Sequence, residues 1–232
     1  MTSTNLHLNN LIFKSRENIL DMLKTRGFNT TTYDNYTEDE LILLLEKHQQ
    51  GKFQNVVELS PLDIMLKNDE GHKIIVKYRL DEKFKRTDNL LKQINDIFEK
   101  YELNPEHDCL IIMNVNRVLL KIGVKDDPIQ NFVNLCYLKK YFVQIYGLEN
   151  FTFNISRHQF VPKHSILTKK ESIELLTKYN AILTNLPKIN REDPMAKFIG
   201  AKPNQIIKIE SFNPTTGISL YYRLCAKDLS NS

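Results

Sequence analysis

The sequence predicts two domains, a mixed α/β domain over residues 1–153 and a small α+β domain over residues 154–232. In the first part, apolar residues with helical spacing alternate with short apolar runs that are typical of buried strands. In the second part, two helix-start patterns precede two strand-like runs joined by a turn, which predicts a β-hairpin. The 232 residues can form two hydrophobic cores without a low-complexity linker between them, so we expect a short joint near residues 153–158.

The composition is that of a folded globular protein, with 41% hydrophobic and 26% charged residues. The longest apolar runs are far shorter than the roughly 18 residues of a membrane-spanning helix. The polar N-terminal residues lack the apolar core of a signal peptide, so we do not expect export. The net charge of +4 permits contact with nucleic acid without indicating it. The odd number of cysteines, Cys109, Cys136 and Cys225, predicts buried thiols in a reducing compartment.

Two helices are predicted near the N-terminus. Apolar residues at three-, four- and seven-residue spacings predict a helix over 8–26, and Gly27 follows where a helix needs a left-handed residue. Thr37 and Glu40 have the spacing of a capping box, in which each side chain accepts a hydrogen bond from an amide at the helix start. We expect this second helix to end before Gly51.

The rest of the first domain mixes strands with helices. A turn sequence over 68–71 separates apolar runs and predicts a hairpin-like pair of strands. Residues 137–146 fit either a helix or a strand, because their apolar spacing does not distinguish the two. The other predicted elements are short apolar runs at 56–57, 64–66 and 74–76, a helix with an apolar stripe from Leu90 to Phe98, a buried strand from Cys109 to Met113 and a further strand from Val118 to Ile122.

The second domain begins its helices with recognisable caps. Thr168 and Glu171 form a second capping box, which opens a helix reaching Tyr179. Asp193 precedes Pro194 as an N-cap precedes the first helical position, and Gly200 ends that short helix. The predicted hairpin consists of strands over 205–209 and 219–224 joined through 213–217, where Gly217 supplies a left-handed turn residue.

A series of residues in this second domain resembles a known family. Its order and spacing over about 70 residues are similar to the assembly domain shared by the fifth subunit of eukaryotic RNA polymerases and its archaeal counterpart. Residues 23–28 also resemble the end of the first helix in the two-domain eukaryotic type, which adds an N-terminal jaw domain. The series consists of residues 158–164, Leu175, Leu176, Tyr179, residues 186–189, Asp193, Pro194, Gly200, residues 206–209, Gly217, Tyr222 and Arg223.

The resemblance implies a non-catalytic subunit of a multisubunit DNA-dependent RNA polymerase, with no cofactor, no metal and no membrane contact. One copy is expected in a hetero-oligomer, docked through the assembly domain on the largest subunit and in contact with other polymerase subunits. The jaw domain is expected to have a nuclease-like core without a catalytic site and to lie near downstream duplex DNA. The residues expected to form the assembly interface or the assembly fold are Val161, Pro162, His164, Leu186, Pro187, Asp193, Pro194, Gly217, Tyr222 and Arg223.

Some positions depart from the family pattern. Asn204 stands where the family usually has glycine, and asparagine is the residue that best replaces glycine at positive φ. Ser211 replaces an arginine and Glu210 an apolar strand residue, so interface contacts at these positions are expected to differ. The chain also continues past Arg223 into a polar tail over 227–232.

Two basic clusters are candidates for weak, non-specific contact with DNA. Each combines lysine or arginine with an aromatic neighbour, as suits phosphate contacts beside a duplex. Ordinary solvated faces have the same composition, and the sequence leaves both interpretations open. The candidate DNA-proximal residues are Lys83, Lys85 and Arg86 around Phe84, and Lys139 and Lys140 before Tyr141.

Three alternatives compete with this interpretation. Asp63, Ile75 and Lys77 have the outline of a nuclease metal site, but the position that needs a second carboxylate holds isoleucine. A free-standing transcription regulator that uses the same assembly domain is the second alternative. The third is a metal site formed by His158, His164 and Cys225, whose spacing does not support a closed site.

The composition also bears on origin. The richness in Asn, Lys and Ile favours an AT-rich genome, such as that of a large DNA virus encoding its own polymerase. A virion or host cytoplasm would then be the expected location, whereas a cellular subunit, for example from a protist, would be nuclear.

Overall fold

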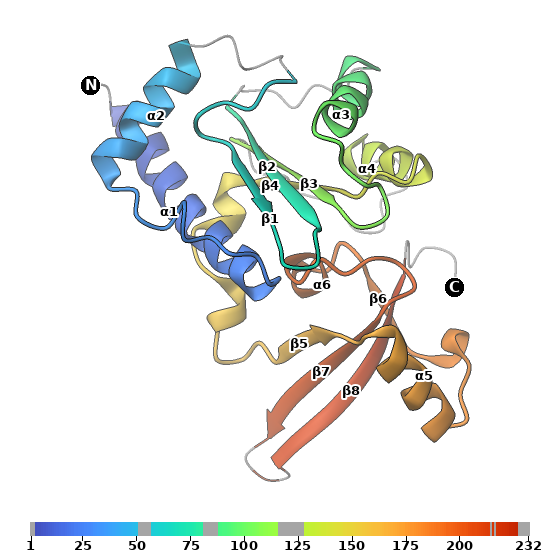
Figure 1. The fold of residues 1–232 in the computed structure, drawn as a ribbon. Helices are drawn as coiled ribbons and strands as arrows, with labels where there is room; N and C mark the ends of the chain where they lie inside the picture. Colours follow the sequence, from blue (N-terminus) through green and yellow to red (C-terminus); the bar gives the residue numbers. More distant parts are fainter. Residues whose placement is uncertain are drawn as a thin grey trace. The chain divides into compact units, whose positions relative to one another are not determined.

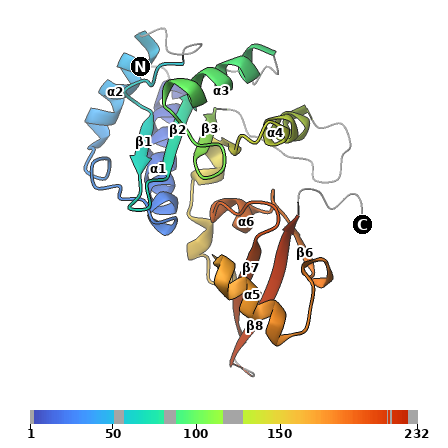
Figure 2. The same cartoon turned by 45° about the vertical axis from the view of Figure 1, so that its right-hand side comes forward.

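The computed structural model describes residues 3–50, 57–80, 88–115, 128–213, 215 and 217–226. The chain divides into two compact units, Met1–Phe153 and Asn154–Ser232, each with its own sheet (Figure 1, Figure 2). The strand predicted over 118–122 and the polar tail lie outside the described residues. Within the described ranges, no helix has both the length and the apolar character that crossing a membrane requires.

A four-stranded mixed sheet forms the centre of the N-terminal unit, in the order β1-β2-β3-β4. β1 and β2 are antiparallel and joined by the predicted turn, where Gly71 has φ 86°. β2, β3 and β4 run parallel, which requires crossover connections of the kind that helices provide. The strands are β1 (Ile64–Lys67), β2 (Lys73–Arg79), β3 (Cys109–Asn114) and β4 (Val143–Gly147).

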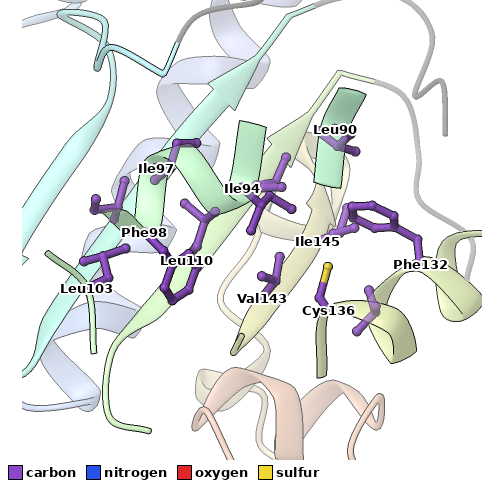
Figure 3. Packing of buried hydrophobic residues seen from close by; sticks show 13 residues of the cluster. Leu90, Ile94, Ile97, Phe98, Leu103, Leu110, Phe132, Cys136, Val143 and Ile145 are labelled. Carbon is purple, nitrogen blue, oxygen red and sulfur yellow. The ribbon is translucent and has the colours of Figure 1, made fainter. Parts of the chain in front are cut away.

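Helices α3 (Asp88–Lys100) and α4 (Pro128–Leu138) cover one face of this sheet (Figure 3). Facing strand residues such as Ile75, Leu110 and Val143 lie opposite one another in the register and point to the same side. The resulting core consists of Ile75, Leu90, Ile94, Ile97, Phe98, Leu103, Leu110, Ile112, Phe132, Val133, Cys136, Val143 and Ile145.

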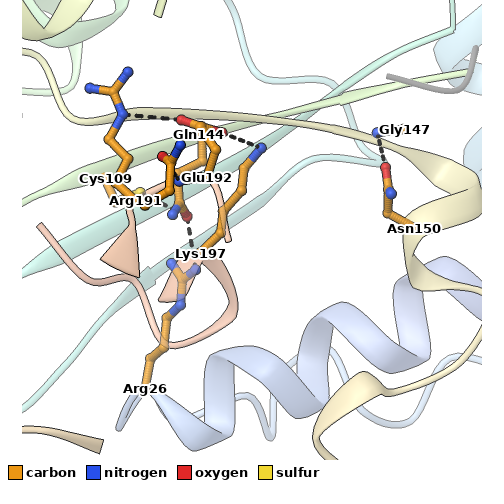
Figure 4. Close-up of polar contacts among 9 residues, drawn as sticks. Arg26, Cys109, Gln144, Gly147, Asn150, Arg191, Glu192 and Lys197 are labelled. Atoms are coloured by element: carbon orange, nitrogen blue, oxygen red, sulfur yellow. Dashed lines mark hydrogen bonds and ion pairs between the residues drawn. The ribbon is translucent and has the colours of Figure 1, made fainter. Parts of the chain in front are cut away.

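Helix α1 (Ser3–Thr25) lies on the other face of the sheet, and helix α2 (Glu38–Gln50) follows it. Arg26 Nη2 donates to Gln144 Oε1 at 2.8 Å (Figure 4). Gln144 is next to Val143, which packs in the core with α3 and α4, so its side chain points to the opposite face. α1 begins earlier than the predicted Leu8 and ends at Thr25, one residue before the predicted end, and the left-handed Gly27 with φ 84° follows as expected. The capping box at the start of α2 is present, with Glu40 Oε2 accepting from the Thr37 amide at 2.8 Å.

Residues 137–146, which the sequence could not assign, belong to two elements. α4 ends at Leu138, a tight turn follows in which Lys140 has φ 66°, and β4 begins at Val143. The prediction of a strand at 56–57 was wrong for Val57, which lies in a bend. Val56 lies outside the described residues.

The C-terminal unit is a four-stranded sheet in the order β5-β7-β8-β6 with one helix on each face. β7 (Ile206–Asn213) and β8 (Gly217–Ala226) form the central antiparallel hairpin. Both strands are longer than predicted and include Asn213 and Gly217, which the sequence assigned to the connection. The remaining elements are β5 (Lys163–Ile166), β6 (Lys188–Asn190), α5 (Lys169–Lys178), α6 (Pro194–Phe198) and short 3-10 turns over Ile155–Arg157 and Leu183–Asn185.

Alternating strand residues place α5 and α6 on opposite faces of this sheet. Ile207, Ile209 and Cys225 point to the α6 side, where they form a core with Ala196. Tyr222 points to the other side and contacts the Tyr179 ring at the end of α5, with ring centroids 6.4 Å apart.

The predicted caps are confirmed in the C-terminal unit. Thr168 and Glu171 form the capping box of α5. Asp193 Oδ1 accepts hydrogen bonds from the amides of Met195 at 2.9 Å and Ala196 at 3.2 Å, and so satisfies two amides that the helix cannot pair. Asn204 has φ 70°, as expected for a residue that replaces glycine.

A buried ion cluster connects the end of β6 with α6 (Figure 4). Glu192 lies 3.1 Å from Arg191 Nε and 3.1 Å from Lys197 Nζ, and all three side chains are at most 8% exposed. Burial opposes ionisation of Glu192, but the charges of Lys197 and Arg191 outweigh it, so the pKa of the carboxyl lies below its ordinary value. The cluster therefore holds three charged side chains in a buried position, which the sequence did not indicate.

We predict that Asp193→Ala lowers the free energy of unfolding by about 1 kcal/mol, because two amides at the start of α6 lose their acceptor. Asp193→Asn keeps a side-chain oxygen and should cost less. Urea denaturation of the full chain measures both changes. An Asn variant as unstable as the Ala variant would show that the carboxylate charge, and not the cap, stabilises this helix.

We also predict a pH dependence that originates at Glu192. Because its pKa is lowered in the folded state, its contribution to stability is present above the unfolded value of about 4.5 and is lost as the pH falls through the folded value. Glu192→Gln should therefore flatten the decline in stability at acid pH, whereas Glu174→Gln at an exposed position should not. Equal acid sensitivity of wild type and Glu192→Gln in denaturation at several pH values would contradict this assignment.

Candidate interaction site on the C-terminal unit

The central hairpin extends beyond the strands that flank it. β5 pairs with β7 only as far as Glu210, and β6 pairs with β8 only from Leu224 onward. The outer edges of residues 211–213 and 217–223 therefore face no other strand in the described part of the chain. Such edges offer backbone amides and carbonyls to which another polypeptide can add a strand.

This distal part of the hairpin also exposes large apolar side chains. Phe212 is 74% exposed and Ile218 70% exposed, and the two lie directly opposite each other on the same face. Leu220, 50% exposed, lies on that face too, whereas Tyr221, 55% exposed, points to the other face. A cluster of exposed apolar residues beside unpaired strand edges is typical of a protein-binding surface. We call Phe212, Ile218, Leu220 and Tyr221 the distal patch.

A half-buried ion pair separates the distal patch from the part of the face that α5 covers. Lys208 Nζ lies 2.7 Å from Glu210 Oε1. The hydrogen bond between the two side chains raises the pKa of Lys208 and lowers the pKa of Glu210, so both stay charged near neutral pH. A solvent-accessible pair of this kind adds little stability but forms a polar border to the apolar surface.

The motif residues before and in β5 lie along one edge of the sheet. Val161, Pro162 and His164 are half-buried, and His164 Nδ1 lies 2.7 Å from the Pro162 carbonyl oxygen. Leu186 and Pro187 lie at the opposite edge, directly before β6. The Pro187 carbonyl accepts a hydrogen bond from the Leu224 amide at 2.8 Å.

The other motif residues serve the fold and the hairpin. Asp193 and Pro194 start α6, and Gly217 opens β8 with φ 77°. Tyr222 packs on Tyr179, whereas Arg223 is exposed and donates from Nη1 to the Lys188 carbonyl at 3.4 Å. The motif residues thus surround the sheet and do not gather in one site.

Sequence reasoning missed the distal patch. Residues 219–224 were predicted only as a strand of the hairpin, and Phe212 and Ile218 received no role. The available signal was the length of the apolar alternation relative to the short runs that became β5 and β6. Long strands between short neighbours must leave part of their edges open.

The structure describes one of the two basic clusters. Lys139 and Lys140 are exposed in the turn between α4 and β4. Their aromatic neighbour Tyr141 packs on Phe98 of the core at 4.4 Å between ring centroids, so it does not stand beside the lysines as a stacking surface. Lys83, Lys85 and Arg86 lie outside the described residues.

Asp63 and Lys77, two of the three residues that have the spacing of a nuclease metal site, make contacts within the fold. Asp63 accepts hydrogen bonds from the amides of Ser60 at 2.8 Å and Tyr78 at 2.7 Å. Lys77 Nζ lies 3.8 Å from Asp63 and donates to the Glu58 carbonyl at 2.7 Å. Burial raises the pKa of Asp63 against the opposing charge of Lys77, and burial lowers the pKa of Lys77.

Ile75 stands where a second carboxylate ligand would be needed. It is 0% exposed and packs in the core with residues of β3 and α3. An aliphatic side chain has no atom that binds Mg²⁺, so Asp63 and Lys77 lack the second carboxylate that such a metal site requires.

Comparison with known proteins identifies the C-terminal unit. The family described as RNA polymerase Rpb5, C-terminal domain, matches residues 153–225. The DNA-directed RNA polymerase subunit Rpo5 of Pyrococcus horikoshii is 45% identical over 76 residues, which are 33% of this chain and 93% of that protein. The Rpo5 subunit of Archaeoglobus fulgidus is 47% identical over 72 residues, 31% of this chain and 95% of that protein.

A eukaryotic relative matches a longer segment. The subunit rpabc1 of DNA-directed RNA polymerases I, II and III from Dictyostelium discoideum is 32% identical over 120 residues, which are 51% of this chain and 61% of that protein. A match of 120 residues is longer than the C-terminal unit, so it includes residues of the N-terminal unit. The chain belongs to the Rpb5/Rpo5 family of DNA-directed RNA polymerase subunits.

Proposed function

We propose that the chain is a non-catalytic assembly subunit that docks on the largest subunit of its polymerase through the distal part of the β7–β8 hairpin. The observation that carries this proposal is the distal patch beside unpaired strand edges, within the unit that matches the family. Docking would pair these edges with a strand of the partner while the apolar side chains leave water.

The energetics favour this surface. Burying one large apolar side chain stabilises a complex by about 1.5–3 kcal/mol, and Phe212, Ile218 and Leu220 can be buried together because they share a face. Pairing of a hairpin edge with a strand of the partner would also fix the register and the direction of that strand. The ion pair of Lys208 and Glu210 would remain at the rim, where charged residues are common in protein interfaces.

The N-terminal unit would act as a jaw beside downstream duplex DNA. Its mixed α/β sheet is compatible with a nuclease-like core without activity, because Ile75 is apolar and Asp63 is engaged by backbone amides. Lys139 and Lys140 would contribute weak phosphate contacts. The location would follow the polymerase, in the nucleus for a cellular enzyme and in the virion or host cytoplasm for a viral one.

We predict that Ile218→Asp lowers recovery of the largest subunit at least about tenfold when the tagged chain is purified with its own polymerase, because a buried carboxylate would be unpaired. Ile173→Asp on α5 is the matched control, since Ile173 is 66% exposed outside the distal patch. Mass spectrometry of the eluate measures the ratio of the subunits.

Two outcomes would contradict the docking proposal. Equal recovery with Ile218→Asp and Ile173→Asp would remove the distal patch from the interface. A wild-type chain that elutes without polymerase subunits would point to a free-standing regulator that uses the same assembly domain.

We predict that the double variant Lys139→Gln, Lys140→Gln weakens the salt dependence of duplex binding by the full chain. Loss of one or two phosphate contacts should reduce the slope of log affinity against log salt concentration by about 1–2. Lys169→Gln with Lys170→Gln, an exposed pair at the start of α5, serves as the control. An unchanged slope in fluorescence anisotropy titrations would exclude the turn after α4 from DNA contact.

A further inference from the structure

The N-terminal unit contains a buried cation whose charge is not used in the proposed docking or DNA contact. Arg16 lies on α1 and is 2% exposed. Its Nη1 donates to the Leu62 carbonyl oxygen at 2.6 Å. Nε and Nη2 are also buried, and neither makes a hydrogen bond within the described residues. Two donors of a buried guanidinium are therefore unsatisfied, which is costly unless a ligand binds them.

The geometry of these two donors indicates the class of ligand. Nε–H and Nη2–H lie side by side on one edge of the planar guanidinium, which matches the two oxygens of a carboxylate. No carboxylate pairs with Arg16 in the described part of the chain. The buried Tyr78 hydroxyl interacts with the Arg16 guanidinium, but burial raises the pKa of this hydroxyl to about 12, so it remains neutral and cannot act as the counter-ion.

Two tyrosine rings cover the guanidinium. Their centroids lie 5.7 Å from Arg16 Cζ for Tyr33 and 5.4 Å for Tyr36. The Tyr33 hydroxyl is held by the backbone of Met65, at 3.3 Å from the amide and 3.4 Å from the carbonyl. The Tyr36 hydroxyl has no hydrogen bond among the described residues. The Tyr36 side chain can therefore rotate away from Arg16 with the loss of a single cation–π contact.

A cavity of about 300 Å³ adjoins this cluster. Arg16, Tyr33 and Tyr36 line it together with apolar side chains of α1 and α2, including Leu20 and Leu41. This volume is at the lower end of ligand pockets, so it suits one side chain with a short backbone segment and not a large cofactor.

The rim of the cavity is acidic. Glu17, Asp21 and Asp34 line it, and Lys24, which also lines it, pairs with Asp34 at 3.0 Å, so the acidic groups outnumber the one basic group of the rim. These carboxylates repel a phosphate dianion more strongly than a single carboxylate, and they favour a ligand that also carries a positive charge. The rim therefore favours an acidic side chain next to a basic residue over a nucleotide.

We propose that this cavity binds the carboxylate of a glutamate or aspartate, followed by a basic residue, in a polypeptide partner. Arg16 holds the carboxylate through Nε and Nη2, Tyr36 moves to admit it, and Glu17 receives the basic side chain. The site goes beyond the proposed function, which uses the C-terminal hairpin and the lysines after α4.

The test titrates the full chain with N-acetyl-Glu-Lys-amide and follows the Nε–H resonance of Arg16 by NMR. We expect a saturable shift and an affinity about tenfold higher than for N-acetyl-Gln-Lys-amide, which lacks the charge. Sodium acetate should bind more weakly than the Glu dipeptide, and inorganic phosphate more weakly than acetate. Equal binding of the Glu and Gln dipeptides, an unmoved Arg16 resonance, or tighter binding of phosphate would each overturn the proposal.

A variant of the exposed rim avoids the risk that a substitution of buried Arg16 unfolds the unit. Glu17→Gln should strengthen acetate binding about two- to threefold and should weaken the preference for Glu-Lys over N-acetyl-Glu-amide. Glu46→Gln, at an exposed position of α2 outside the cavity, should change neither quantity. Identical behaviour of the Glu17→Gln and Glu46→Gln variants would place the ligand elsewhere and overturn the assignment.

Discussion

The pairing of β7 with β8 is the constraint on which the C-terminal unit depends. β5 joins the sheet through β7 and β6 joins it through β8, while α5 and α6 pack on the two faces of the same hairpin. Because β5 has four residues and β6 three, they cannot cover hairpin strands of eight and ten residues. The outer strand edges of the distal hairpin therefore remain unpaired, and no other helix or strand covers its apolar side chains among the described residues of the unit.

The elements that the sequence predicted are those with local causes. The capping box at Thr168, the cap at Asp193 and the left-handed residues Gly27 and Asn204 depend on neighbours a few residues away, and all are present in the structure. The bounds of β7 and β8 were harder to predict, because strand length depends on pairing with a distant segment. For the same reason the sequence could not divide residues 137–146 between a helix and a strand.

The candidate sites were less predictable than the fold. The ion cluster of Glu192 with Arg191 and Lys197 was not predicted, since its burial depends on tertiary packing. Arg16 likewise resembles a solvated helix residue until the tyrosines that cover it are located. The family resemblance pointed to the C-terminal unit, which the family model matches, whereas the residues of the distal patch emerged only from register and exposure.

Hydrogen exchange of the hairpin is the most direct test of the central claim that the distal part of β7 and β8 forms the docking surface. The measurement compares the free chain with the same chain assembled in its polymerase. We predict that amides over 211–213 and 217–223 exchange rapidly in the free chain and become protected on assembly. Unchanged exchange there, with new protection confined to other surfaces of the C-terminal unit, would contradict it.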